Sequence, residues 1–188
     1  DRWFTVDGRQ GGAGTSTHMN VNEVIAHLAS ARLGQAGSVE PLRDVNLHQS
    51  TNDTYPTALK LCAALRLAQA AKAAEALQGA FQKKETEFAS IATVGRTEMQ
   101  SAVPMTLGAI FSSFAEAAGR DRWRIFKCEE RIRTVNLDGT AVGTGLAAPQ
   151  DYIFRATDEL RRISGVRLAR GENLVDQTAN ADAFAEVA

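Results

Sequence analysis

The sequence lacks the marks of several protein classes. Only two cysteines, Cys62 and Cys128, occur in 188 residues. Both lie in helical patterns, which argues against a disulfide framework and fits a reducing cytoplasm. No apolar run approaches membrane-spanning length, and no signal peptide is visible. A net charge of −1 gives no electrostatic reason to expect a nucleic acid or an anionic membrane as partner.

Helical periodicity dominates the chain, and no convincing period-2 alternation predicts a strand. Apolar spacing predicts helices over residues 21–33, 54–92, 104–133 and 150–164, with a further helix starting near residue 180. The two longest patterns carry apolar seams that include Phe81 and Phe88 in the first and Phe111 and Phe114 in the second. Ile163 is expected to face inward, and residues 173–178 are expected to form a polar connector. The glycine-rich residues 1–20 are expected to be extended or to form a short hairpin or loop. We therefore expect an all-α fold, an up-and-down bundle of long antiparallel helices.

One polar stretch, Asn46–Thr57, directly precedes the longest helical pattern. Ser50, Thr51, Asn52 and Asp53 are residue types that cap helix N-termini, and Pro56 suits a first helical turn. A helix that begins here points unpaired N–H groups and a positive dipole end forward. Together with these side-chain donors, that end suits a carboxylate or another small anion. The alternative interpretation is a well-capped helix without a ligand.

Two further stretches have a related design. Residues 95–108, GRTEMQSAVPMTLG, again place polar residues before a proline and a helical run, and residues 11–26, GGAGTSTHMNVNEVIA, place a glycine-rich turn before a short amphipathic helix. With residues 45–58, VNLHQSTNDTYPTA, and residues 140–146, TAVGTGL, they follow the order and spacing of the aspartase/fumarase superfamily. The chain resembles that family over nearly its whole length.

The resemblance implies an elimination across a Cα–Cβ bond that gives fumarate, without a cofactor and without a metal. A base removes a proton beside a carboxylate, and preorganised donors stabilise the charge that grows on that carboxylate. The positions that would hold the carboxylates of a small dicarboxylate substrate are Thr15, Ser50, Thr51, Asn52 and Thr97, and further candidates are Glu98 and Thr140. The resemblance also implies a homotetramer built around a large helical bundle.

The motifs most resemble those of aspartate ammonia-lyases, which convert L-aspartate to fumarate and ammonia. Ala13, Ser16 and Thr51 carry this distinction, since fumarate hydratases tend to have other small polar residues there. The alternatives are a fumarate hydratase, which interconverts malate and fumarate, and a non-catalytic helical assembly domain.

The catalytic residue itself stays unassigned. The family's base is a serine in a Gly-Ser-Ser loop, and no such pattern occurs up to Ala188. We therefore expect residues 1–188 to be the central helical-bundle domain of a longer chain, with an N-terminal domain and a C-terminal catalytic-loop region absent, and the isolated fragment to be inactive.

Four residues depart from the family's pattern. Glu98 stands where His or Gln is usual, and an ionised carboxylate cannot donate hydrogen bonds. His18 replaces a common amide, Ser101 replaces an Asp, and Asp138 stands where Gly is usual. None of these departures removes a core donor, and Glu98, Ser101 and Asp138 favour the assembly-domain alternative.

Overall fold

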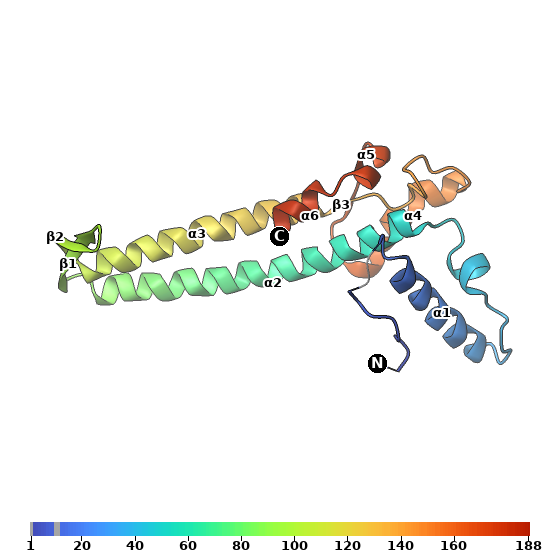
Figure 1. The fold of residues 1–188 in the computed structure, drawn as a ribbon, viewed down its shortest axis with the longest axis horizontal. Helices are drawn as coiled ribbons and strands as arrows, with labels where there is room; N and C mark the ends of the chain where they lie inside the picture. Colours follow the sequence, from blue (N-terminus) through green and yellow to red (C-terminus); the bar gives the residue numbers. More distant parts are fainter. Residues whose placement is uncertain (1, 10–11) are drawn as a thin grey trace. The chain divides into compact units, whose positions relative to one another are not determined.

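The computed structural model describes residues 2–9 and 12–188, so Gln10 and Gly11 of the glycine-rich motif lie outside the described residues. The all-α expectation is confirmed (Figure 1). None of the described helices is both long and apolar enough to cross a membrane. In chain order the elements are α1 (Thr15–Arg32), the π-helix η1 (Pro41–Val45), α2 (Thr51–Glu87), β1 (Ala92–Thr97), β2 (Gln100–Thr106), α3 (Leu107–Ile132), β3 (Thr134–Val135), α4 (Gln150–Ser164), β4 (Ala169–Arg170), α5 (Leu174–Ala179) and α6 (Asp182–Val187).

The chain divides into two compact units. The first contains the residues up to Ala63 and those from Ile132 to Glu186, and the second contains Ala64–Arg131. Helix α2 runs without a break from the first unit into the second. The polar motifs around residues 50 and 140 therefore belong to one unit, and the motif around residue 97 belongs to the other.

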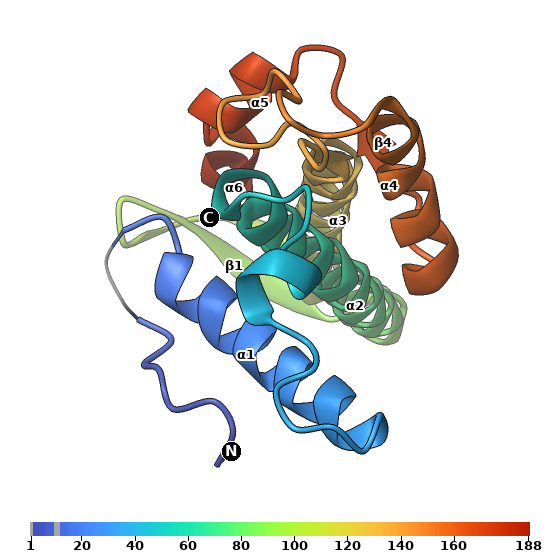
Figure 2. The same cartoon turned by 90° about the vertical axis from the view of Figure 1, so that its right-hand side faces the viewer.

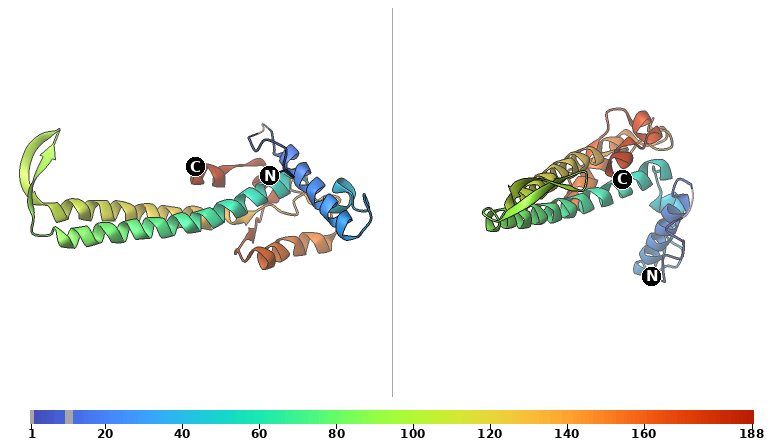
Figure 3. Two further views of the ribbon diagram at one scale, coloured as in Figure 1. Left: turned by 90° about the horizontal axis from the view of Figure 1, so that it is seen from below. Right: turned by 60° about the vertical axis from the view of Figure 1, so that its left-hand side comes forward.

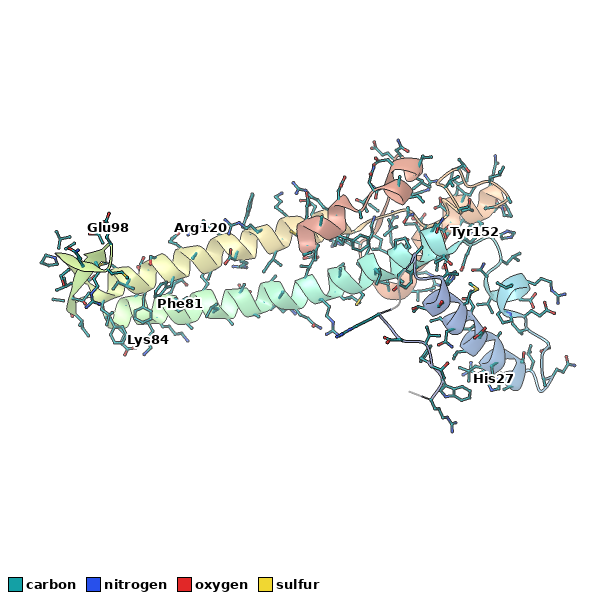
Figure 4. The ribbon with its side chains drawn as sticks, in the orientation of Figure 1. His27, Phe81, Lys84, Glu98, Arg120 and Tyr152 are labelled. Atoms are coloured by element: carbon teal, nitrogen blue, oxygen red, sulfur yellow. The ribbon has the colours of Figure 1, made fainter. Side chains whose placement is uncertain are left out.

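In the second unit α2 and α3 lie side by side and antiparallel (Figures 1 and 3). Their facing surfaces meet through aromatic rings, with Phe81 of α2 at 5.5 Å from Phe114 and Phe88 at 5.4 Å from Phe111, measured between ring centroids. Figure 4 shows Phe81 between the two helices. The predicted seam residues therefore do pair two long helices, as the periodicity indicated.

The expectation of no strands is wrong where α2 ends. Residues 92–106 form an antiparallel β-hairpin, not the start of a helix at Pro104, and α3 begins only at Leu107 (Figure 3). The two-residue turn, Glu98 and Met99, has positive φ angles of 49° and 65°. Positive φ at both turn residues matches the twist of a tight hairpin, and it is normally supplied by Asn-Gly, so the sequence gives little warning of this turn.

The core of the first unit is small. Val135, Leu137 and Leu168 are buried together, and Leu61 of α2 and Leu160 of α4 pack against them. Strands β3 and β4 pair in parallel beside this core. Figure 2 shows the short elements of this unit around the first turns of α2. These contacts fix the loop that follows β3 close to the start of α2.

Several boundaries also differ from the prediction. Helix α4 has the predicted bounds and ends at Gly165, whose φ is 68°, but Ile163 is 73% exposed and not inward. Helix α1 begins at Thr15, six residues earlier than expected, and α2 begins at Thr51. The stretch expected to be a polar connector, residues 173–178, is mostly helix α5. Polar residues fill the first turns of α1 and α2, so apolar spacing does not mark where these two helices begin.

Candidate functional site at the amino end of α2

The amino end of α2 is closed by a reciprocal cap. The Ser50 hydroxyl accepts a hydrogen bond from the Asn52 N–H at 3.2 Å, and the Asp53 carboxylate accepts from the Ser50 N–H at 3.0 Å. The Thr54 hydroxyl donates to the same Asp53 oxygen. This is a capping-box arrangement in which an acidic residue at the third helical position satisfies the N–H of the cap residue. The cap uses the Ser50 oxygen as an acceptor and leaves its hydrogen available to another group.

Pro56 lies six residues into α2, not in its first turn as expected. A proline has no N–H, so it leaves the carbonyl four residues earlier without its helical partner. That carbonyl belongs to Asn52, and it accepts a hydrogen bond from the side-chain amide of Asn136 at 2.9 Å. The proline thus leaves the Asn52 carbonyl free to accept a hydrogen bond from the loop that follows β3.

Two more hydrogen bonds tie this loop to α2. The second Asp53 oxygen accepts from the backbone N–H of Thr140 at 2.9 Å, and the Asn52 side chain donates to the carbonyl of Ala141 at 2.7 Å. Asp53 is fully buried, so both of its oxygens are used inside the protein. The motifs around residues 50 and 140 are therefore one structural element, although about 85 residues separate them in sequence.

The loop contains its own buried ion pair. Asp138 has a φ of 75°, a backbone conformation in which glycine is favoured and most side chains are strained. Its fully buried carboxylate accepts hydrogen bonds from Arg170 of β4 at 2.8 to 3.1 Å. Burial raises the pKa of the Asp138 carboxyl, and the Arg170 guanidinium opposes that rise. The pair gives a physical reason for an acid at a position where the resemblance implies glycine.

A pocket of about 770 Å³ opens where the loop meets the start of α2. Ser50 and Thr51, both half-buried, line it from the helix side, and Thr140 lines it from the loop. Its remaining walls mix polar and apolar side chains from Asn46, Leu47, His48, Gln49, Ala141, Val142, Thr144, Leu146 and Ala147. A ligand here would meet neutral hydroxyl donors and the positive end of a 37-residue helix.

Burial shifts the pKa of two ionisable groups beside the pocket-lining residues upward. Burial raises the pKa of Asp53, and its hydrogen bonds with Ser50, Thr140 and Thr54 oppose that rise. Burial and the nearby Asp53 also raise the pKa of Tyr152 to about 12. Figure 4 labels Tyr152, whose ring lies 5.7 Å from that of His48. At neutral pH the tyrosine is therefore a neutral hydroxyl.

Helix α1 packs beside the start of α2, although none of its residues lines the pocket. Gly14 precedes it with a φ of 82°, and a β-carbon at this position would lie 2.3 Å from the Tyr55 ring. Glycine is therefore required for α1 to begin against α2. One turn later the buried His18 makes a 2.9 Å hydrogen bond through Nδ1 with the Thr51 hydroxyl. Burial lowers the pKa of His18, with Asp53 acting in the opposite direction.

The structure brings only part of the predicted set together. Ser50, Thr51 and Thr140 share the pocket, and Asn52 is adjacent but bound to Ala141. Thr15 is the exposed first residue of α1 and does not line the pocket. Thr97 and Glu98 are exposed on the hairpin of the second unit, where Figure 4 labels Glu98.

Sequence reasoning missed three residues of this site. His18 was noted only as a departure from the family pattern, Asp53 only as a capping residue type, and Asn136 not at all. The spacing of Ser50 and Asp53 was a usable signal, because Ser-x-x-Asp is a variant of the capping box. The contacts of Asn136 had no local signal, since they depend on a partner 84 residues away.

Comparison with known proteins places this arrangement in a family. A family model described as a lyase matches residues 1–188. The chain belongs to this lyase family. An aspartate ammonia-lyase from Bacillus sp. is 42% identical over 188 residues, covering 98% of the chain and 40% of the relative. An aspartate ammonia-lyase from Pseudomonas aeruginosa is 44% identical over 186 residues, covering 96% of the chain and 39% of the relative.

Two solved structures also resemble the chain in fold and in sequence. A fumarate lyase/delta crystallin from Brucella melitensis, bound to cobalt, has a TM-score of 0.90 and 44% identity, covering 95% of the chain and 40% of that structure. A class II fumarase from Schistosoma mansoni has a TM-score of 0.87 and 31% identity, covering 100% of the chain and 43% of that structure. The chain thus spans about 40% of the length of these relatives.

Proposed function

We propose that the native-length protein is an ammonia-lyase that reversibly eliminates ammonia from L-aspartate to give fumarate. One observation carries the proposal: the Ser50 and Thr51 hydroxyls line a pocket at the amino end of α2, in a chain 42% identical to an aspartate ammonia-lyase. A helix amino end with added hydroxyl donors suits a carboxylate. The substrate assigned by this proposal is therefore a small dicarboxylate.

The elimination requires hydrogen-bond donors at one carboxylate of the substrate. When a base removes the proton beside that carboxylate, a second negative charge spreads onto its oxygens, and the amino group on the neighbouring carbon then leaves as ammonia. Preorganised donors that meet the growing charge lower this barrier, and they need no reorganisation as the charge develops. In the proposal Ser50 and Thr51 supply those donors. The proposed carboxylate contacts of Asn52, Thr15 and Thr97 rest on the family resemblance alone, since none of the three lines the pocket.

The general base is proposed to come from a segment outside residues 1–188. The pocket supplies hydrogen-bond donors, and none of its lining residues is assigned to proton abstraction. The matched relatives are longer, with this chain spanning about 40% of their length. The proposed role of residues 1–188 is accordingly that of the central helical part of a longer polypeptide, which binds the substrate carboxylate.

A fumarate hydratase is the second candidate. The structural match to a class II fumarase, with a TM-score of 0.87 and 31% identity, supports it. The two activities share the carboxylate chemistry and differ in the leaving group, which is ammonia from aspartate and water from malate. Thr51, Ala13 and Ser16 favour the ammonia-lyase because of their resemblance to that branch of the family.

We further propose a cytoplasmic homotetramer. Large apolar side chains of α3 remain exposed in the chain, including Phe114 at 45%, Trp123 at 62% and Phe126 at 52%. Exposed apolar surface of this kind on a long helix suits burial against other copies. Cys62 and Cys128 are not joined in a disulfide, which suits a reducing compartment. Sedimentation of the native-length protein tests the assembly state, and a stable monomer would contradict it.

The site is tested by the double variant Ser50→Ala, Thr51→Val in the native-length protein. We expect fumarate release from L-aspartate to fall by at least about 100-fold, since two hydrogen bonds to a charged group are lost. Helix content should stay unchanged. The matched control is Ser113→Ala with Thr86→Val, which removes two exposed helical hydroxyls of the second unit. Undiminished fumarate release by the Ser50/Thr51 variant would show that the substrate carboxylate does not bind at this position.

A further inference from the structure

Behind the pocket, α1 contributes a buried histidine that does not line the pocket. His18 is 5% exposed, and its two ring nitrogens have different partners. Nδ1 lies 2.9 Å from the Thr51 hydroxyl oxygen, and Nε2 lies 3.4 Å from the side-chain nitrogen of Asn22. The role of the histidine depends on which nitrogen carries the proton, because a neutral imidazole has one donor and one acceptor.

The neighbouring hydrogen bonds settle that choice, because each one fixes the direction of the next. The backbone carbonyl of Gln49 can only accept, so the Asn46 side chain presents its NH₂ group there, at 3.3 Å. The Asn46 oxygen then faces Asn22 and accepts from its NH₂ group at 3.3 Å. The same NH₂ group faces His18 Nε2, which must therefore accept. The imidazole proton is left on Nδ1, which donates to Thr51.

We propose that His18 is a positioning residue for Thr51. Its Nδ1–H donates to the oxygen of the Thr51 hydroxyl and thereby directs the hydroxyl hydrogen toward a substrate carboxylate in the pocket. The inference rests on the proposed carboxylate site, because Thr51 matters here as a donor to that carboxylate. A hydroxyl can donate one hydrogen only, so a partner that donates to its oxygen keeps that hydrogen available.

Burial supports the neutral state that this arrangement needs. The surroundings of His18 lower the pKa of its imidazole, with Asp53 as the charged group that opposes this effect. A protonated ring would carry hydrogens on both nitrogens and would turn Nε2–H toward the NH₂ group of Asn22. The hydrogen-bond chain from Gln49 to Thr51 is therefore consistent only with the neutral ring bearing its proton on Nδ1.

A double-mutant cycle in the native-length protein separates positioning from a merely structural role. Thr51→Val should lower kcat/KM for L-aspartate about 30-fold and His18→Leu about 10-fold, in line with hydrogen bonds to charged and neutral groups. If His18 acts through Thr51, the combined variant falls no further than Thr51→Val alone. Multiplication of the two losses, to about 300-fold, would overturn the proposal.

Two further variants sharpen the cycle. His18→Asn should recover most of the loss seen in His18→Leu, because a side-chain amide nitrogen can take the place of Nδ1 as donor to Thr51. His27→Leu is the matched control, since His27 is on the exposed side of the same helix and contacts the Trp3 ring instead. Failure of His18→Asn to recover any activity would contradict the donor role.

The tautomer can be measured without any activity. Nitrogen NMR of the native-length protein with ¹⁵N-labelled histidine, assigned with His18→Asn, should show the His18 proton on Nδ1. A proton on Nε2 would overturn the inference whatever the kinetics show. If the wild-type protein releases no fumarate from L-aspartate, the proposed function fails, and the tautomer still decides the role of His18.

Discussion

Replacing Asp53 with alanine should loosen the attachment of the loop after β3 to the start of α2. Asp53 is fully buried and accepts from the backbone N–H of Ser50 and of Thr140 through its two oxygens. Alanine offers neither acceptor, so two backbone donors lose their partners. The bonds from Asn52 to Ala141 and from Asn136 to Asn52 remain, so the loop is loosened and not released entirely.

The expected size of the effect follows from the lost hydrogen bond between the Thr140 N–H and Asp53. Leaving one buried donor unsatisfied costs about 1–3 kcal/mol. On the scale of a local opening equilibrium this is a roughly 5- to 150-fold increase in the open population. Hydrogen–deuterium exchange with mass spectrometry on the native-length protein measures it directly. We expect residues 136–149 to exchange faster by that factor, while residues 154–164 of α4 keep their wild-type rates.

The control variant is Asp151→Ala. Asp151 is an exposed acid in the first turn of α4, so this change removes a comparable interaction with a helix dipole but no buried hydrogen bond. It should leave exchange in residues 136–149 unchanged. Wild-type exchange of that segment in a folded Asp53→Ala protein would refute the view that Asp53 holds the loop.

Three further predictions concern stability, measured as the melting temperature of the native-length protein. Gly14→Ala should destabilise by more than about 1 kcal/mol, because its β-carbon would meet the Tyr55 ring at 2.3 Å and its φ is 82°; an unchanged melting temperature would contradict this. Arg170→Ala should cost about 2–3 kcal/mol, since it leaves the buried Asp138 carboxylate unpaired, and adding Asp138→Asn should restore part of the loss; no restoration would count against the ion pair. Tyr152 has a folded pKa of about 12, above its ordinary value of 10.0, so its stabilising contribution is present below pH 10 and is lost as the pH rises through 12. Tyr152→Phe should flatten the fall in melting temperature between pH 10 and 12, and an equally steep fall would show that another group titrates there.

Sequence reasoning recovered the helices that periodicity and glycine punctuation define. Helix α4 has a strong apolar stripe and a glycine stop at residue 165, and its bounds were predicted correctly. The paired phenylalanines of α2 and α3 were likewise visible as seam positions. The hairpin was missed because Glu98 and Met99 are unusual residues for a turn with positive φ, and because Pro104 looked like the start of a helix.

The site was predictable only in its local part. The donors at Ser50 and Thr51 followed from capping residue types, which act within a few residues of chain. Their joining to Thr140 through Asp53 could not be predicted, since no short-range pattern links positions 87 residues apart. The role of His18 could not be predicted for a different reason. It depends on which way the hydrogen bond between His18 and Thr51 points, and that direction is fixed by the positions of Asn22 and Asn46.

The central claim is tested most directly by fumarate release from the native-length protein, given L-aspartate and L-malate in parallel. Release from L-aspartate with none from L-malate is the result predicted here. Release from L-malate alone would contradict the ammonia-lyase and assign a fumarate hydratase. A folded oligomer that releases fumarate from neither would contradict both and favour a helical assembly domain.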